Sequence, residues 1–110
     1  MPQFIFQASY TAESLRGQIE NPQDRVGPTR GAIEAVGGSL VFAGWTFGDY
    51  DFICILDAPD EVSAAGVAVA FAAGGAVKTT KTTRVLSGDE WLSVLGKSAI
   101  VRGTYKPPVS

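Results

Sequence analysis

The sequence predicts an α+β protein with a ferredoxin-like βαββαβ protomer, in which helices cover one face of an antiparallel sheet. Three observations support this prediction. The apolar segments follow the order strand, helix, strand, strand, helix, strand. The chain has 110 residues, of which 45% are hydrophobic and 18% are charged, so it has the size and composition of one domain with a packed core. Both faces of the predicted sheet are apolar, so both must be covered.

The first strand is expected at residues 4–9, where apolar side chains alternate with others. Thr11 is suited to cap the weak helix that follows. Asn21-Pro22 has the features of a fresh helix start, but a proline at position 28 would remove a hydrogen bond inside a continuous helix. We therefore expect the regular second part at residues 28–36, ended by Gly37-Gly38.

Two further strands are expected at residues 39–47 and 50–56, which are rich in β-branched and aromatic side chains. Only Gly48-Asp49 separates them, and a Gly-first connection of two residues is typical of a type II′ hairpin. The register that such a turn fixes places Phe47 opposite Tyr50, Trp45 opposite Phe52, Ala43 opposite Cys54 and Val41 opposite Leu56.

A long uncharged helix is expected at residues 62–73, with a start at Ala58-Pro59-Asp60-Glu61 and a stop at Gly74-Gly75. Both of its faces are apolar. One face can pack on the sheet, so the other needs a further contact.

The segment 77–86 has the threonines and basic residues of an edge strand that is protected by charge. Ser87 and Glu90 then form a capping box at the start of a short helix, which we expect Gly96 to end. Residues 1–97 would form the domain. Residues 98–110 would form a C-terminal arm with a brief strand-like stretch at 99–101.

The sheet face that the helices leave bare predicts self-association. This face carries either the set with Trp45, Phe47 and Phe52 or the equally apolar set on the other side of the same strands. Trp and Phe side chains bury on the order of 150 to 250 Å² each, so such a face is too apolar to stay exposed to water in a monomer. We expect two sheets to pack face to face as a homodimer. The second face of residues 62–73 and the C-terminal arm are candidate surfaces for a higher oligomer.

Charge and residue usage exclude several classes of function. The net charge of −2 and the pI near 4.9 provide no basic field, so we expect no nucleic-acid or membrane partner. The chain has no histidine and one cysteine, so we expect no metal site and no cofactor. The N-terminus lacks the basic and apolar regions of a signal peptide, and no uncharged stretch reaches the roughly 20 residues that cross a bilayer, so we expect a cytoplasmic protein.

The run Gly48-Asp49-Tyr50-Asp51, with the apolar strand and the Asp57-Ala58-Pro59-Asp60 helix start that follow it, resembles the signature of the GYD domain family. The resemblance extends over roughly residues 2–95, including the Tyr10-Thr11 step. It implies a bacterial-type protein with a dimeric α/β barrel fold and a biochemical role that is not established. Gly27-Pro28 and the arm depart from the family pattern.

Six residues are candidates for binding a small ligand. Tyr50 and Trp45 could line a pocket between two sheets, with Asp51 as a hydrogen-bond acceptor or general base. Alternatively, Tyr50 simply packs and Asp51 binds Thr46 or turn amides, which we favour for Asp51. Cys54 is expected to be a small buried hydrophobe, because no histidine could activate it.

Gln7 and Ser9 share one side of the first strand and would point toward the space between the sheets. They could orient a ligand, or they could bind their equivalents across a dimer axis. Arg84 is the best single cation for a substrate carboxylate or phosphate.

Two classes of function fit these observations. The first is a homo-oligomeric module for small-ligand binding or assembly. The second is a cofactor-independent oxygenase or isomerase that acts on a small substrate, aromatic or not, in a pocket between the sheets. An intersheet pocket that combines Trp45 or Tyr50 with Gln7 and a buried carboxylate would favour the enzyme, whereas a filled, dry interface would favour binding or assembly.

Overall fold

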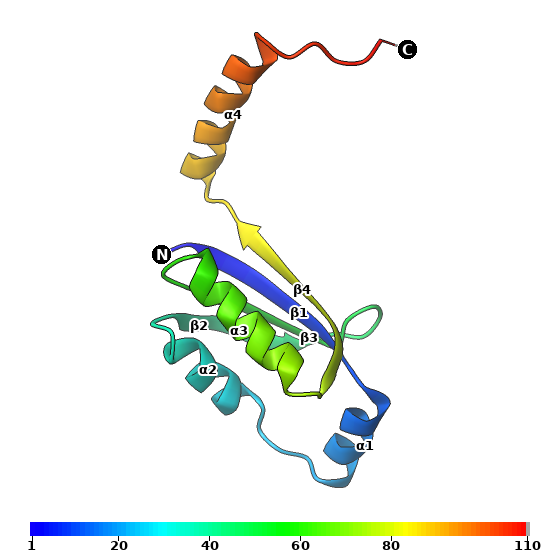
Figure 1. The fold of residues 1–110 in the computed structure, drawn as a ribbon. Coiled ribbons are helices and arrows are strands. Elements are labelled where there is room, and N and C mark those ends of the chain that lie inside the picture. The colour runs from blue at the N-terminus through cyan, green and yellow to red at the C-terminus, as the bar shows by residue number, and fades with distance from the viewer. Residues whose placement is uncertain (110) are drawn as a thin grey trace.

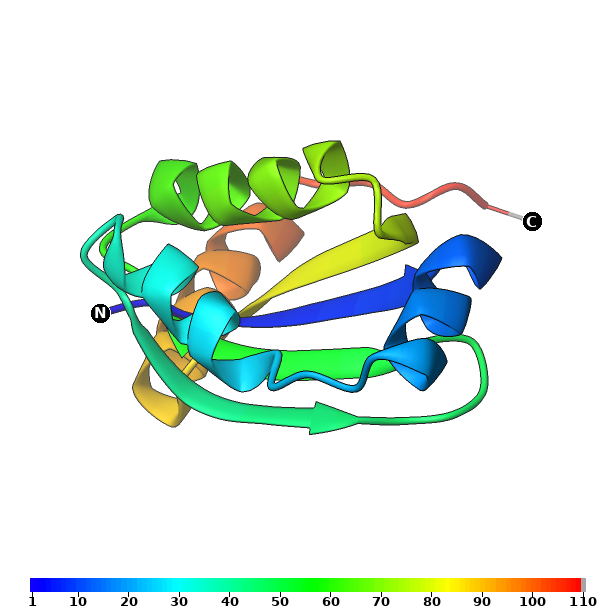
Figure 2. The same cartoon turned by 90° about the horizontal axis from the view of Figure 1, so that it is seen from below.

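The computed structural model describes residues 1–109, and it contains one four-stranded antiparallel sheet with the strand order β2-β3-β1-β4 (Figure 1). The elements are β1 (Gln3–Tyr10), α1 (Ala12–Glu20), α2 (Val26–Glu34), β2 (Ser39–Trp45), β3 (Phe52–Asp57), α3 (Glu61–Ala73), β4 (Val77–Val85) and α4 (Gly88–Arg102). Helices α2 and α3 lie on the same face of the sheet (Figure 2). This arrangement confirms the predicted α+β, ferredoxin-like fold.

The core lies between this face of the sheet and helices α2 and α3. Every second residue of the central strands β1 and β3 points into it, as the alternation of apolar side chains predicts. Ile33 of α2 and Val67 of α3 pack on these strands from above. The strand residues buried in the core are Phe4, Phe6, Ala8, Phe52, Cys54 and Leu56.

The first helical region differs from the sequence expectation. Thr11 caps α1 as predicted, because its hydroxyl accepts the Ser14 amide at 3.0 Å. Asn21, however, ends α1 and starts no new helix. Helix α2 begins at Val26, so Pro28 lies in its first turn. Backbone N–H groups in the first turn have no carbonyl partner within the helix, so a proline there removes no hydrogen bond. The expected regular segment 28–36 is therefore shifted toward the N-terminus.

Gly37 and Gly38 end this region for two different reasons. Gly37 adopts a φ of +81°, which is the left-handed conformation expected after a helix. The Gly38 amide reaches back to the Ile33 carbonyl at 3.1 Å. A Cβ on Gly38 would lie 2.4 Å from the Asp57 carbonyl oxygen, so only glycine lets the chain pass this close to β3.

The β2–β3 connection is longer than the predicted two-residue turn. Pairing ends at Trp45 and Phe52, and the Thr46 hydroxyl donates to the Tyr50 carbonyl at 2.7 Å across a wider loop. The predicted pairing of Phe47 with Tyr50 is wrong, because the hairpin closes at Thr46, whose amide donates to the Asp51 carbonyl at 2.8 Å. The Asp51 amide donates to the Ala8 carbonyl of β1 at 2.9 Å.

The register of β2 and β3 is confirmed over most of its length and changes once. Trp45 lies opposite Phe52 and Ala43 opposite Cys54, as predicted. An irregularity between Leu40 and Phe42 then places Leu40, and not Val41, opposite Leu56.

Helix α4 is longer than expected, because Gly96 does not end it. The capping box of Ser87 and Glu90 starts the helix as predicted, and the helix continues to Arg102, so the segment 99–101 is helical and not strand-like. A glycine inside a helix costs only about 1 kcal/mol relative to alanine, which good helix formers on either side can offset. None of the residues of α4 is buried, and the helix extends beyond the end of the sheet (Figure 1).

One ion-pair network joins α4 to the sheet. Arg84 Nη2 donates to Glu90 Oε2 at 2.7 Å, and Arg84 Nε donates to Glu61 Oε1 of α3 at 3.3 Å. The hydrogen bond from Arg84, followed by that from the Ser87 amide, lowers the pKa of Glu90 from 4.5 to about 2. The contact is thus fully formed above pH 4.5 and is lost as the pH falls toward 2.

We expect Gly38→Ala to destabilise the fold by about 1 to 3 kcal/mol, because the added methyl group must displace the Asp57 carbonyl. Gly66→Ala in α3 is the matched control. A Cβ there meets no atom within 4 Å, so this change should stabilise the helix by about 0.5 to 1 kcal/mol. Urea unfolding at equal protein concentrations measures both values, and a neutral Gly38→Ala would contradict the close approach.

We expect Arg84→Met to raise the pKa of Glu90 from about 2 toward 4.5, since the largest cause of the low value is removed. Carbon-detected NMR titration of the Glu90 carboxyl measures this pKa directly. Lys81→Met is the control, because Lys81 is also a cation of β4 but pairs with Gln7 in the sheet. An unchanged Glu90 pKa in Arg84→Met would show that this ion pair does not form in solution.

Candidate functional site

The face of the sheet opposite α2 and α3 carries a continuous apolar patch. Cross-strand neighbours on this face join Phe42 to Ile55 and Ile55 to Ile5, and Ile53 lies one pair further along β3. The three isoleucines are only partly buried, and Phe42 is 53% exposed. We call Phe42, Ile55, Ile5 and Ile53 the open-face patch. No described helix covers it.

Gly44 makes room for the most exposed member of this patch. A Cβ on Gly44 would lie 3.0 Å from Cζ and 3.1 Å from Cε2 of Phe42, so the phenylalanine ring occupies the space that a side chain at position 44 would need.

The half of the open face near β4 is polar. Gln7 lies opposite Ile53 on one side and Lys81 on the other. Ser9 is buried, and its hydroxyl is hydrogen-bonded to that of Thr79. Gln7 and Ser9 thus lie on the helix-free face where the sequence analysis placed them, and Ser9 is already paired within the protomer.

Helix α4 carries a second unpartnered apolar surface. Trp91, Leu92 and Leu95 lie on one stripe of the helix, because residues three and four apart share a face, and all three are exposed. We call these residues the α4 stripe. It cannot be a core stripe of the protomer, since α4 buries no residue.

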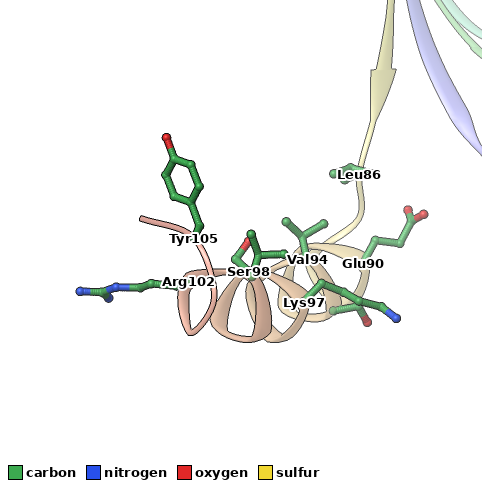
Figure 3. A pocket seen from close by; sticks show the side chains of 9 residues that line it. Leu86, Glu90, Val94, Lys97, Ser98, Arg102 and Tyr105 are labelled. Atoms are coloured by element: carbon green, nitrogen blue, oxygen red, sulfur yellow. The ribbon is translucent and has the colours of Figure 1, made fainter. Parts of the chain in front are cut away.

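A different side of α4 lines a wide hollow of about 650 Å³ (Figure 3). Leu86, Val94, Val101 and Tyr105 contribute apolar atoms, and Glu90 and Lys97 lie along one side of it. The lining comes only from α4 and the segments that flank it, so the hollow is a helix surface and not an enclosed binding site.

Trp45 and Asp51 meet on the helix side of the sheet, around Tyr10. The Trp45 ring packs edge-on against buried Phe52, with centroids 5.3 Å apart, and its indole N–H donates to the Tyr10 hydroxyl at 3.1 Å. The Asp51 carboxylate accepts the Tyr10 amide at 2.9 Å. Asp51 therefore holds a backbone amide at the register shift that ends β1. Its role is structural, as favoured from the sequence, but its partner is Tyr10 and not the expected Thr46 or turn amides.

The two remaining sequence candidates lie elsewhere. Tyr50 belongs to the β2–β3 loop, where its carbonyl accepts the Thr46 hydroxyl. Arg84 lies on the helix side, 5.7 Å from the ring centroid of Phe4, and both of its acidic neighbours are already bound to it. The positive charge of Arg84 is thus compensated by Glu61 and Glu90 of the same chain.

The structure does not bring the six candidates together at one place. The combination that would favour an enzyme requires Trp45 or Tyr50 beside Gln7, but Trp45 and Gln7 lie on opposite faces of the sheet. Burial raises the pKa of the Cys54 thiol to about 11, so it is a thiol and not a nucleophilic thiolate at neutral pH.

Among residues 1–109, no cluster of three acidic, histidine or cysteine side chains could hold a metal ion. Within the same residues, no helix combines the length and apolar character that a membrane crossing requires.

Sequence reasoning missed the extent of α4 and the role of Tyr10. The stripe of Trp91, Leu92 and Leu95 was visible in the sequence, but the stop assigned to Gly96 hid the fact that it belongs to a helix of 15 residues. Tyr10 gave no local signal, because its hydrogen-bond partners are Trp45 of β2 and Asp51 of the β2–β3 loop, which are distant in sequence.

Comparisons with known proteins agree with this fold. The GYD domain family model matches residues 4–95. The solved structure of MtbAldR superimposes with a TM-score of 0.55 at 16% sequence identity, covering 78% of this chain and 52% of MtbAldR. This chain therefore matches about half the length of MtbAldR.

The structure of FFRP-DM1 superimposes with a TM-score of 0.52 at 14% identity, covering 78% of this chain and all of that chain. These similarities establish the fold alone. No curated protein shows significant sequence similarity to this chain.

The family match spans most of the sequence and includes the Tyr50–Asp51 loop that holds Tyr10 in place. The chain belongs to the GYD domain family.

Proposed function

We propose that this protein acts as a homo-oligomeric assembly module whose basic unit is a homodimer, with the open faces of two sheets packed against each other. The observation that carries the proposal is the open-face patch, where Phe42 stays half exposed beside three isoleucines. A symmetric dimer would cover the same patch on both copies at once.

The area of the open sheet face indicates that the sheet forms only part of the dimer interface. Four strands about 4.8 Å apart and about 23 Å long cover on the order of 440 Å² in plan. Stable interfaces bury about 800 Å² per partner. A helix of 15 residues adds roughly 22 Å by 10 Å in plan, so α4 is the natural source of further interface.

We propose that the α4 stripe packs on the second copy of the dimer. Helix α4 extends beyond its own sheet (Figure 1). The ion pair of Arg84 with Glu90 joins it to β4. Burying Trp91 and Leu95 would contribute on the order of 1.5 to 3 kcal/mol each, which exceeds the value of a surface ion pair. The ion pair thus orients a helix whose stabilisation comes from the other subunit.

A higher oligomer is a separate proposal. Val62 and Val69 on the outer face of α3 are 82% and 68% exposed, so dimers could associate through these helices. This face lies on the side of the sheet opposite the open-face patch, and the two contacts can form independently.

We expect the protein to have twice the mass of one chain in light scattering at micromolar concentration, and Phe42→Lys to shift it to the monomer. Each phenylalanine contributes about 1.5 to 3 kcal/mol and occurs twice in a symmetric interface, so the dissociation constant should rise about 100-fold or more. Val69→Lys is the control and should keep the dimer while removing any larger species. A monomeric parent protein, or a Phe42→Lys variant that stays dimeric, would refute the proposal.

We expect the fluorescence of Trp91 to report α4 docking. In Trp45→Phe, Trp91 is the only tryptophan of the chain, and its emission should shift to shorter wavelength as the dimer forms, because the ring leaves water. Leu95→Lys should abolish this shift, whereas Ser93→Lys, on another side of the helix, should not. Emission typical of an exposed indole at concentrations where the dimer is complete would rule out α4 as part of the interface.

A further inference from the structure

A cavity of about 220 Å³ lies on the helix side of the sheet, between α2, the end of α3 and strands β1 and β3. It is on the face opposite the open-face patch, so dimerisation through the open faces would leave it accessible. The space exists because small residues meet there: Ala8 in the sheet, Ala70 on α3, and Gly74 directly after the end of α3. The helix therefore spans this part of the sheet without filling it.

The inner part of the cavity is aromatic. Phe6 and Phe71 line it and pack edge to face with each other, with ring centroids 5.3 Å apart. Phe52 adds a third ring from β3. Aromatic rings favour offset or edge contacts with another ring, so these side chains form a suitable wall for a planar aromatic group.

The rim of the cavity carries two hydrogen-bond donors. Arg25 lines it from the start of α2 and makes no ion pair within residues 1–109. The Asp24 carboxylate next to it is occupied by the amides of Val26 and Gly27, at 3.0 and 3.2 Å. The positive charge of Arg25 is therefore available to an anion.

Tyr10 is the second donor, and its hydroxyl is prepared for this role. The Trp45 indole nitrogen can only donate, so the Tyr10 oxygen accepts that bond, and the hydroxyl hydrogen has no acceptor among residues 1–109. Asp51 fixes the backbone of Tyr10 from the other side. Two residues of the predicted ligand set thus act as positioning residues for a donor at this rim.

A second hollow adjoins the cavity at its rim. A more polar hollow of about 500 Å³ beside α1 shares Tyr10, Arg25 and Ala76 with it. A charged group could remain in this wetter hollow while an apolar group enters the cavity. The cavity is smaller than the roughly 300 to 1,000 Å³ of pockets for drug-sized ligands, which limits the apolar part to about one ring.

We propose that this cavity binds a small aromatic carboxylate, with the ring against Phe6, Phe52 and Phe71 and the carboxylate held by Arg25 and the Tyr10 hydroxyl. An arginine and a hydroxyl donor at the entrance of an aromatic cavity match the two ends of such a molecule. The proposal is independent of dimerisation, because no residue of the open-face patch or of the α4 stripe lines the cavity.

Sodium benzoate is the probe, and the 110-residue chain is titrated by amide-detected NMR. We expect millimolar binding, as suits about nine non-hydrogen atoms, with the largest shift changes at Ala8, Thr29, Ala70 and Val77. Benzamide has the same shape and no charge, so its dissociation constant should be about tenfold higher or more. Equal binding of benzamide, or shift changes confined to the open sheet face, would overturn the proposal.

Two variants with matched controls test the two ends of the site. Arg25→Gln should weaken benzoate binding about tenfold or more, whereas Arg30→Gln, an exposed arginine outside the cavity, should leave it unchanged. Ala70→Leu should fill the cavity and abolish binding, whereas Val69→Leu on the exposed side of α3 should not.

Retained binding in Ala70→Leu would show that the ligand lies elsewhere. Light scattering on the same samples reports the dimer separately, so loss of ligand binding and loss of assembly are distinguishable.

Discussion

The two-sidedness of strand β1 is the constraint on which the rest of the structure depends. Phe4, Phe6 and Ala8 are buried under α2 and α3, and the alternation of a strand then forces Ile5 and Gln7 onto the other face. Because β1 lies between β3 and β4, its two faces set the character of the whole sheet. One face is completed by the helices of the same chain, and no described helix covers the other, which carries the open-face patch.

The loop that carries the GYD signature acts on the end of this strand. Asp51 holds the amide of Tyr10 and Trp45 holds its hydroxyl, so the register shift that ends β1 is tied to the β2–β3 connection. The same contacts place Tyr10 beside the cavity under α3. A motif that is short in sequence thus has a structural role that reaches another strand and the rim of a cavity.

The sequence predicted the order of the elements, the helix caps at Thr11 and Ser87 and most of the β2–β3 register, because these depend on local patterns. It did not predict the wide loop after Trp45, since the backbone of Asp51 is bound by β1, which is distant in sequence. The same limit applies to the site residues. Trp45 and Gln7 looked like members of one pocket because sequence spacing does not show which face the helices cover.

The sequence by itself determined the fold class and a surplus of apolar surface, because the periodicity of side chains and their composition do not depend on distant contacts. Only the tertiary structure decided where that surplus lies: on Phe42 and the isoleucines of the open face, and on an α4 that Gly96 does not end. It also created the cavity between Arg25 and Phe71. A void depends on how helices of fixed shape cross a sheet, and no local pattern of residues encodes that packing.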